Sequence, residues 1–169
     1  HALTGDKMYL DKAIEWADKV LQSKAYHKET GLPYYHINLV TGNSIPNKEG
    51  IVLSDSNVGL LEYRYLYELT GDNRYLAHLN ALNQSMTQLA KLRVKGLYGS
   101  KICTETGQWT NHYSSLNYAG RDFYYTLVKA YAQTNGQERF YLDLYRETMQ
   151  AIERNHMFAT SRTGLLYAR

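Results

Sequence analysis

A turn motif that occurs three times at nearly equal spacing is the feature of this sequence that most restricts its fold. Leu3-Thr4-Gly5-Asp6 returns 66 residues later as Leu69-Thr70-Gly71-Asp72, and a looser copy begins 64 residues after that, at Thr134. A second motif, Gly-Leu, keeps the same register at Gly31, Gly96 and Gly164. Two motifs in step over three copies indicate a tandem structural repeat.

The Thr-Gly-Asp turn predicts two helices that meet with almost no linker. Glycine adopts the left-handed conformation that ends a helix, and the aspartate carboxylate accepts backbone N–H groups at the start of the next one. Segments after the turns have one apolar side and should be outer helices, whereas segments before the turns are apolar nearly all round and should be inner helices. The outer helices are predicted at 7–22, 73–92 and 137–155, and the inner helices at 58–69 and 119–133.

The links between an outer helix and the next inner helix have hairpin chemistry. Residues 102–109 form two short β-prone arms around Gly107, and residues 34–42 resemble one arm of a counterpart. The fold class expected is therefore all-α, an α/α toroid in which the loops at one end build the site. Residues 1–169 would form one partial domain of about two and a half helix pairs. So few inner helices do not close a ring, so we expect neighbouring material to be missing, with an open solenoid as the alternative.

Charge and cysteine usage exclude several classes of function. The net charge is +3, and the basic residues are scattered singly, so neither nucleic acid nor an anionic membrane is an expected partner. No apolar run approaches the length of a membrane span. Cys103 is the single cysteine and the six histidines are dispersed, so no metal site is predicted within the chain. Motifs of hydride, phosphoryl and acyl transfer are also missing from the sequence.

Carboxylates at the loop-bearing end are the remaining candidates for chemistry. Asp55 and Asp122 lie at the starts of the two inner helices, and helix capping is the ordinary explanation for both. The functional alternative is glycoside hydrolysis, in which two carboxylates act on opposite sides of a glycosidic bond. Other acids at this end are Glu29, Glu49, Glu62 and Glu105, and aromatics that could face a sugar are Tyr34, Tyr35, Trp109, Tyr113 and Tyr118.

The order of these motifs resembles glycoside hydrolase family 47, the class I α-1,2-mannosidases. The resemblance runs through nearly the whole chain and implies part of an (α/α)7 barrel that trims high-mannose N-linked glycans. The similar stretches are Leu3–Asp6 with Tyr9–Ala13, Gly31–Tyr34 with Asn38-Leu39 and Thr41-Gly42, Leu61–Tyr63, Glu68–Asp72, Gly96-Leu97, Thr106–Trp109 and Asp122–Tyr131.

The resemblance assigns site positions only in part. It implies an active-site acid at Asp55, where the family has Glu. In the ungapped alignment, Arg121 and Tyr125 stand where the family has an Asp and a Glu of the active site. A shift by one residue would place Asp122 at the Asp position but Thr126 at the Glu position. We therefore predict Asp55 and Asp122 as the catalytic acids of this chain.

The resemblance also implies a ligand, a cofactor and a location. We expect Tyr34, His36, Asn38, Arg121 and Tyr125 to bind the glycan. Calcium is implied by the family, with its ligands outside this chain, as is the helix that bears the general-acid Glu. The expected partners are a high-mannose glycan or glycoprotein and the remainder of the barrel, from the same or an associated chain. Family members work in the lumen of the endoplasmic reticulum or Golgi or are secreted, and Asn83-Gln84-Ser85 matches a glycosylation acceptor.

Three functions are compatible with these observations. The first is an inverting α-1,2-mannosidase, to which this segment contributes without being active alone. The second is a catalytically silent relative that binds mannose or a glycan, because Arg121 and Tyr125 replace two acids. The third is a helical-repeat scaffold for protein partners, which only the bare repeat supports.

Overall fold

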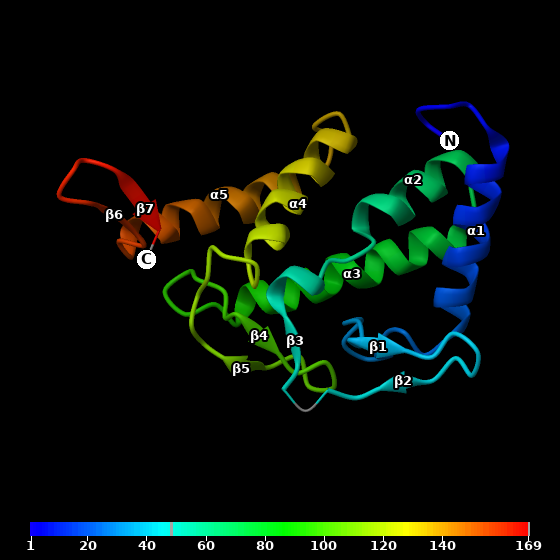
Figure 1. Ribbon diagram of the computed structural model, residues 1–169, viewed down its shortest axis with the longest axis horizontal. Coiled ribbons are helices and arrows are strands. Elements are labelled where there is room, and N and C mark those ends of the chain that lie inside the picture. Colours follow the sequence, from blue (N-terminus) through cyan, green and yellow to red (C-terminus); the bar gives the residue numbers. More distant parts are fainter. Residues whose placement is uncertain (48, 169) are drawn as a thin grey trace.

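Five helices form the body of the chain in the computed structural model, which describes residues 1–47 and 49–168. The boundaries predicted from the sequence lie within two residues of those observed. Among the described helices, none is both long and apolar enough to cross a membrane. In chain order the helices are α1 (Lys7–Gln22), α2 (Leu60–Thr70), α3 (Asn73–Lys91), α4 (Arg121–Gln133) and α5 (Arg139–Arg154) (Figure 1).

The Thr-Gly-Asp turns have the predicted geometry. Gly71 ends α2 with φ +67°, and the Asp72 carboxylate accepts the backbone N–H of Arg74 at 2.9 Å at the start of α3. Asp6 caps α1 in the same way, accepting the N–H of Met8 at 2.8 Å. The looser third copy is different, since α5 begins after Glu138, whose side chain makes no capping bond.

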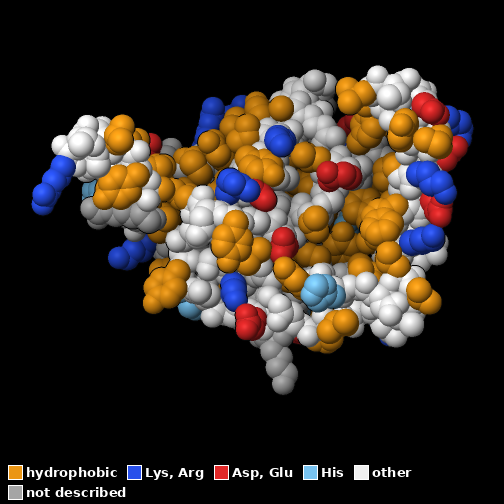
Figure 2. Space-filling view, in the orientation of Figure 1, with side chains coloured by type: hydrophobic (Ala, Val, Ile, Leu, Met, Phe, Trp, Pro, Cys, Tyr) orange, Lys and Arg blue, Asp and Glu red, His pale blue; other side chains and the backbone are white. Residues whose placement is uncertain are grey.

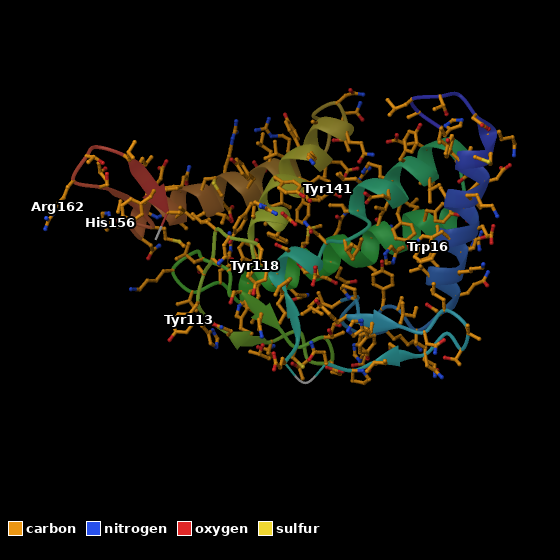
Figure 3. The ribbon with its side chains drawn as sticks, in the orientation of Figure 1. Trp16, Tyr113, Tyr118, Tyr141, His156 and Arg162 are labelled. Atoms are coloured by element: carbon orange, nitrogen blue, oxygen red, sulfur yellow. The ribbon has the colours of Figure 1, made fainter. Side chains whose placement is uncertain are left out.

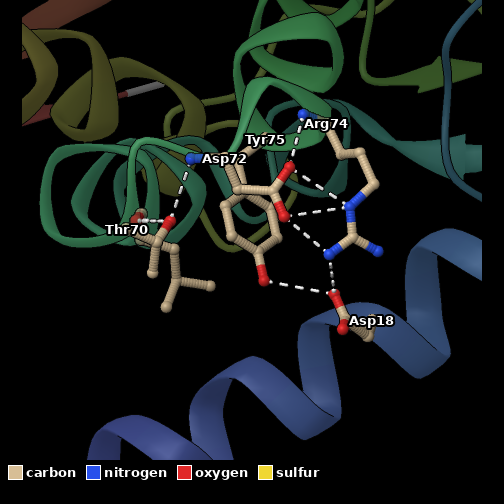
Figure 4. A network of polar contacts seen from close by, with 6 residues as sticks. Asp18, Thr70, Asp72, Arg74 and Tyr75 are labelled. Carbon is tan, nitrogen blue, oxygen red and sulfur yellow. Dashed lines mark hydrogen bonds and ion pairs between the residues drawn. The ribbon is translucent and has the colours of Figure 1, made fainter.

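The second turn also holds α1 against the rest of the chain (Figure 4). Arg74 pairs with its own capping residue, Asp72, at 2.6 Å and with Asp18 of α1 at 3.1 Å. The Tyr75 hydroxyl donates to the same Asp18 carboxylate at 3.2 Å. One repeat is therefore tied to the next through the motif that defines it.

The helices pack as an arc of inner and outer members. Each inner helix lies against the outer helix that follows it, α2 on α3 and α4 on α5, and α2 also contacts α4. Gln133 of α4 donates to the carbonyl of Leu61 in α2 at 2.9 Å. The helices of the described residues do not close into a ring. Consequently the inner helices are not buried all round as their composition predicts, and Leu69, Tyr125 and Val128 are each about 40% exposed.

A polar network couples the second and third repeats. Arg64 of α2, 12% exposed, forms a forked ion pair with Glu138 at 2.7 and 2.8 Å. Its guanidinium also lies 3.1 Å from the hydroxyl of Tyr141 (labelled in Figure 3), which donates to Asn83 at 2.8 Å. Asn83 therefore contacts α5 from within α3, and Ser85 of the same glycosylation pattern is 4% exposed.

Short antiparallel strands occupy the links, mostly along the lower edge and left side of Figure 1. The predicted hairpin around Gly107, whose φ is +67°, is confirmed. An additional strand, β3, comes from the preceding link and pairs with β4, which the sequence did not reveal. The strands are β1 (His36–Ile37), β2 (Ser44–Ile45), β3 (Ile51–Val52), β4 (Lys101–Ile102), β5 (Trp109–Asn111), β6 (Phe158–Thr160) and β7 (Leu166–Ala168).

A histidine inside an aromatic cluster makes the fold sensitive to acid. The ring of His78 in α3 lies 4.2 Å from that of Tyr26 and 4.5 Å from that of Tyr63, centroid to centroid. Its Nε2 is buried and makes no hydrogen bond within the described part of the chain. Burial lowers the pKa of His78 to about 4, so the folded protein holds the ring neutral.

We expect His78→Phe to reduce the loss of stability in acid. The unfolded chain binds the His78 proton below a pH of about 6.5 and the folded chain only below about 4, so stability falls as the pH drops through this window. Between pH 7 and pH 4.5 the histidine should cost about 2 kcal/mol that phenylalanine does not. Urea unfolding of both proteins at the two pH values measures this difference. Equal acid losses in both would contradict a buried neutral His78.

Candidate functional site

The structure brings the starts of the two inner segments together at one end of the arc. A short 3-10 helix, η1 (Leu53–Asp55), follows β3 directly and packs on the N-terminus of α4. The backbone N–H of Ser54 donates to the carbonyl of Ala119 at 2.9 Å, and its hydroxyl donates to the carbonyl of Tyr118 at 2.8 Å. The N–H of Asp122 donates to the same hydroxyl at 3.3 Å.

Asp55 and Asp122 therefore lie near each other at this contact, close enough for the charge of Asp122 to act on Asp55. Asp55 is half-buried, and its burial raises the pKa of its carboxyl group, with a further rise from the negative charge of Asp122. A raised pKa means that Asp55 keeps a proton at a higher pH than an exposed aspartate does. A carboxyl group with a raised pKa beside a second carboxylate is a common feature of acid–base sites.

Helix capping does not account for these two carboxylates. Within residues 1–47 and 49–168, neither accepts a hydrogen bond from a backbone N–H, and glycines (Gly59 and Gly120) occupy the N-cap positions of α2 and α4. The Asp122 carboxylate instead accepts a bond from Nε of Arg121 at 2.8 Å. The pair is thus left available for another role, at the end of the arc where the links gather.

Arg121 and Tyr125 flank the pair on α4. The Arg121 side chain is 64% exposed and bound to Asp122. The Tyr125 ring lies under the ammonium group of Lys129, which is 4.3 Å from the ring centroid. Both Arg121 and Tyr125 line a cavity of about 560 Å³ between α4 and α5, at the open side of the arc.

Tyr34, His36 and Asn38 lie together on and beside strand β1, away from the acid pair. Asn38 shapes the β1–β2 turn, since its Oδ1 accepts the N–H groups of residues 40 and 41 at 2.9 and 3.0 Å. His36 is exposed, and its ring lies against that of Tyr35 at 4.7 Å. None of the hydrogen bonds or ion pairs of the described residues connects these side chains to Asp55 or Asp122.

The remaining acids have individual partners or lie elsewhere. Glu49 pairs with Lys101 at 3.0 Å, and Glu105 accepts a bond from the thiol of Cys103 at 3.4 Å. Glu62 is exposed on α2 and lines a cavity beside α1. In Figure 2, the acidic side chains near the middle of the molecule are scattered singly, and some lie beside a basic side chain.

One of the aromatic residues expected to face a sugar does not do so. Trp109 is 9% exposed, and its indole N–H donates to the carbonyl of Leu92 at 2.8 Å, so it belongs to the core. The expectation fails because an indole in a short strand gives no sequence signal of which face it occupies. Tyr113 and Tyr118 are by contrast 81% and 68% exposed.

Ser54 is the residue of this site that sequence reasoning missed. Its hydroxyl and backbone connect η1 to α4, and these contacts bridge more than 60 residues of sequence. Its position directly before Asp55 was a possible signal. A serine next to an acid is too common, however, to be distinguished without the fold.

Comparison with known proteins decides the family. The model of glycosyl hydrolase family 47 matches residues 1–169. The chain belongs to glycosyl hydrolase family 47. Its similarity to curated members of the family extends over almost the whole chain, although those members are much longer.

Relatives of this family-47 chain carry mannosidase names. It is 32% identical to mannosyl-oligosaccharide alpha-1,2-mannosidase IA of Drosophila melanogaster, over 99% of this chain and 25% of that protein. It is 30% identical to mannosyl-oligosaccharide 1,2-alpha-mannosidase of Candida albicans, over 97% of this chain and 29% of that protein. It is 28% identical to mannosyl-oligosaccharide 1,2-alpha-mannosidase IB of Homo sapiens, over 98% of this chain and 26% of that protein. The chain spans about a quarter of the length of these relatives.

The family resemblance implies calcium, with its ligands expected outside this chain. Across the described segments 1–47 and 49–168, no group of three or more His, Cys, Asp or Glu side chains is arranged to hold a metal ion. Calcium prefers six to eight oxygen ligands, which the two aspartates of the acid pair do not supply. The chemistry derived below therefore uses only the side chains of this chain.

Proposed function

We propose that the protein is an inverting α-1,2-mannosidase-type glycosidase acting on high-mannose N-linked glycans, and that this chain contributes two of its active-site carboxylates. The observation that carries the proposal is the pair Asp55 and Asp122, brought near each other by the packing of η1 on α4 and free of a capping role. Membership of glycosyl hydrolase family 47 and the names of the relatives support the substrate class.

The two carboxylates suit different parts of one reaction. Inverting glycosidases place carboxyl groups on both sides of the glycosidic bond, with room for a water molecule on the attacking side. Burial raises the pKa of Asp55, so this carboxyl group takes up a proton more readily than an exposed aspartate and suits proton exchange with a sugar oxygen. Asp122, bound to the Arg121 guanidinium, is an acceptor that orients a water molecule or a sugar hydroxyl.

We also propose that this chain is an arc of the larger α/α ring. Each side of the arc has a cavity lined mainly by apolar side chains, of the kind into which a helix packs. One of about 500 Å³ lies between α1 and α2 and is lined by Trp16, Val58 and Tyr65, and the other lies beside α4 and α5. Trp16 is 58% exposed at the first of them (Figure 3). An inner helix of a neighbouring repeat on each side, from the same or an associated chain, would bury these surfaces.

Mannose release from a high-mannose glycan by the complete protein tests the proposal. We expect α-1,2-linked mannose to be removed with inversion at the anomeric carbon, which NMR of the first-formed sugar detects. Chelation of calcium should stop release, with ligands for the ion supplied from outside this chain. We expect this activity in the lumen of the secretory pathway. A complete, folded protein that binds glycan but releases no mannose would contradict the proposal.

A silent glycan-binding relative is the second candidate, and one contact favours it. Nε of Arg121 lies 2.8 Å from Asp122, so a positive charge sits beside one of the two carboxylates. Loss of a general acid or base removes 10²–10⁴-fold of the rate, about 3–5 kcal/mol, while binding contacts can persist. Binding of α-1,2-mannobiose without turnover is the result expected for this candidate.

A further inference from the structure

A polar groove with two exposed tyrosines lies next to the acid pair and takes no part in the chemistry above. Its volume is about 560 Å³, and it runs between strands β4 and β5 and the loop of residues 113–118. Tyr113 and Tyr118 stand on that loop and are 81% and 68% exposed (Figure 3). Tyrosine is enriched at binding surfaces because its ring is apolar and its hydroxyl forms hydrogen bonds.

The loop is held in place by its own hydrogen bonds. Oδ1 of Asn111 accepts the N–H of Tyr113 at 2.8 Å, and Oδ1 of Asn117 accepts the N–H of Ala119 at 3.0 Å. The Ser114 hydroxyl donates to the carbonyl of the buried Tyr98 at 2.7 Å. The loop is therefore ordered before a ligand binds, so binding costs little conformational entropy of the loop.

Groups that bind sugars remain unused on this surface. Within residues 1–47 and 49–168, the hydroxyls of Tyr113 and Tyr118 and the amide NH₂ groups of Asn111 and Asn117 make no hydrogen bond. Amide and phenol groups match the vicinal hydroxyls of a pyranose in size and polarity. A tyrosine ring adds a flat apolar face for the C–H groups of the sugar.

The loop that lines the groove is hydrogen-bonded to the segments that carry the two acids. The carbonyl of Tyr118 accepts the Ser54 hydroxyl at 2.8 Å, and that hydroxyl also accepts the N–H of Asp122 at 3.3 Å. The groove therefore adjoins the turn that carries Asp122, and a glycan would have to be longer than the reacting disaccharide to span the acids and the groove.

We propose that this groove is a second sugar-binding subsite, which holds a distal arm of the oligosaccharide through Tyr113, Tyr118, Asn111 and Asn117. The proposal rests on the proposed function, because it takes the reacting end of the same glycan to lie at Asp55 and Asp122. The ligand proposed for this groove is a neutral oligosaccharide. The polar groups that line it, with Lys101 already paired to Glu49, offer no free charge for an ionic ligand.

Calorimetric binding measurements on the complete protein test the subsite. Two probes are used, a high-mannose glycan and α-1,2-mannobiose, on an Asp122→Asn background that prevents turnover. We expect Tyr113→Ala and Tyr118→Ala each to weaken binding of the long glycan about tenfold and to leave mannobiose binding unchanged. Tyr113→Phe and Tyr118→Phe are the matched controls, since they keep the ring, and they should retain most of the affinity.

The outcomes separate the subsite from the proposed function. If mannobiose binds and the alanine variants bind the long glycan as tightly as before, the subsite is wrong and the proposed function stands. If neither probe binds the protein that carries the native tyrosines, the proposed function fails and the subsite with it. Equal weakening for both probes overturns a distal subsite. So does a lowered melting temperature in the alanine variants, which would mean that a protein segment covers the tyrosines.

Discussion

Replacement of Asp122 by asparagine is expected to lower kcat/KM for mannose release by 10²–10⁴-fold without unfolding the protein. Asparagine keeps the size of the side chain and can still accept a bond from Arg121, which lies 2.8 Å from the carboxylate. It cannot take up a proton at neutral pH. The loss is therefore chemical, and the rate of mannose release measured beside the circular dichroism spectrum shows it.

Asp55→Asn is expected to lose activity and gain stability at the same time. Burial and the charge of Asp122 raise the pKa of Asp55, so the folded chain binds this proton more tightly than the unfolded chain. Stability then falls as the pH rises from about 3.8 through the raised pKa, and this loss is the cost of ionising Asp55 in the folded chain. Asparagine carries no charge and avoids this cost.

Asp143→Asn is the matched control for both substitutions. Asp143 is exposed on the outer helix α5 and makes no hydrogen bond or ion pair among the residues that the structure describes. Its replacement should change neither the rate nor the melting temperature. An Asp122→Asn protein as active as this control would remove Asp122 from the active site.

The helices and turns were predictable because their signals are local. A helix with one apolar side, such as α1, shows its period within 16 residues, and the Thr-Gly-Asp turn carries both the left-handed glycine and the capping carboxylate. Each signal lies within a few residues of the structure that it specifies. The repeat then indicated how the helices alternate without any knowledge of their contacts.

The three-stranded sheet and the acid pair were harder to predict because they depend on distant contacts. Strand β3 has two residues, Ile51 and Val52, and its partner β4 lies about 50 residues further along the chain. No period can be detected in so short a strand. The sequence placed Asp55 and Asp122 at helix starts, but only the packing of η1 on α4 shows that they lie near each other.

The residues at the edge of the site illustrate the same limit. Tyr125 was expected to bind the glycan, and the structure places its ring under Lys129 at the open side of α4. Its role stays a prediction, because a neighbouring inner helix would decide what this side of α4 contacts. A sequence motif identifies the helix turn on which a residue lies more readily than the surface that the residue faces.

Gly50→Ala is expected to destabilise the protein by about 3 kcal/mol or more and to displace the site. Gly50 has φ +77°, and a Cβ atom there would lie 2.1 Å from the carbonyl oxygen of Ile102 in β4. Backbone does not move aside as a flexible side chain does. The alanine should therefore push β3 away from β4, and η1 with Asp55 follows directly after β3.

Gly5→Ala separates this clash from the backbone preference of glycine. Gly5 has nearly the same dihedral angle, φ +71°, but no atom lies within 4 Å of its added Cβ. It should therefore cost only the left-handed penalty, about 1–2 kcal/mol. Urea unfolding compares the two variants, and mannose release shows whether the site has moved. Only Gly50→Ala should lose activity beyond its loss of stability, because β3 is the strand that positions Asp55 beside Asp122. Equal effects of the two variants on mannose release would show that the pairing of β3 with β4 does not position the site.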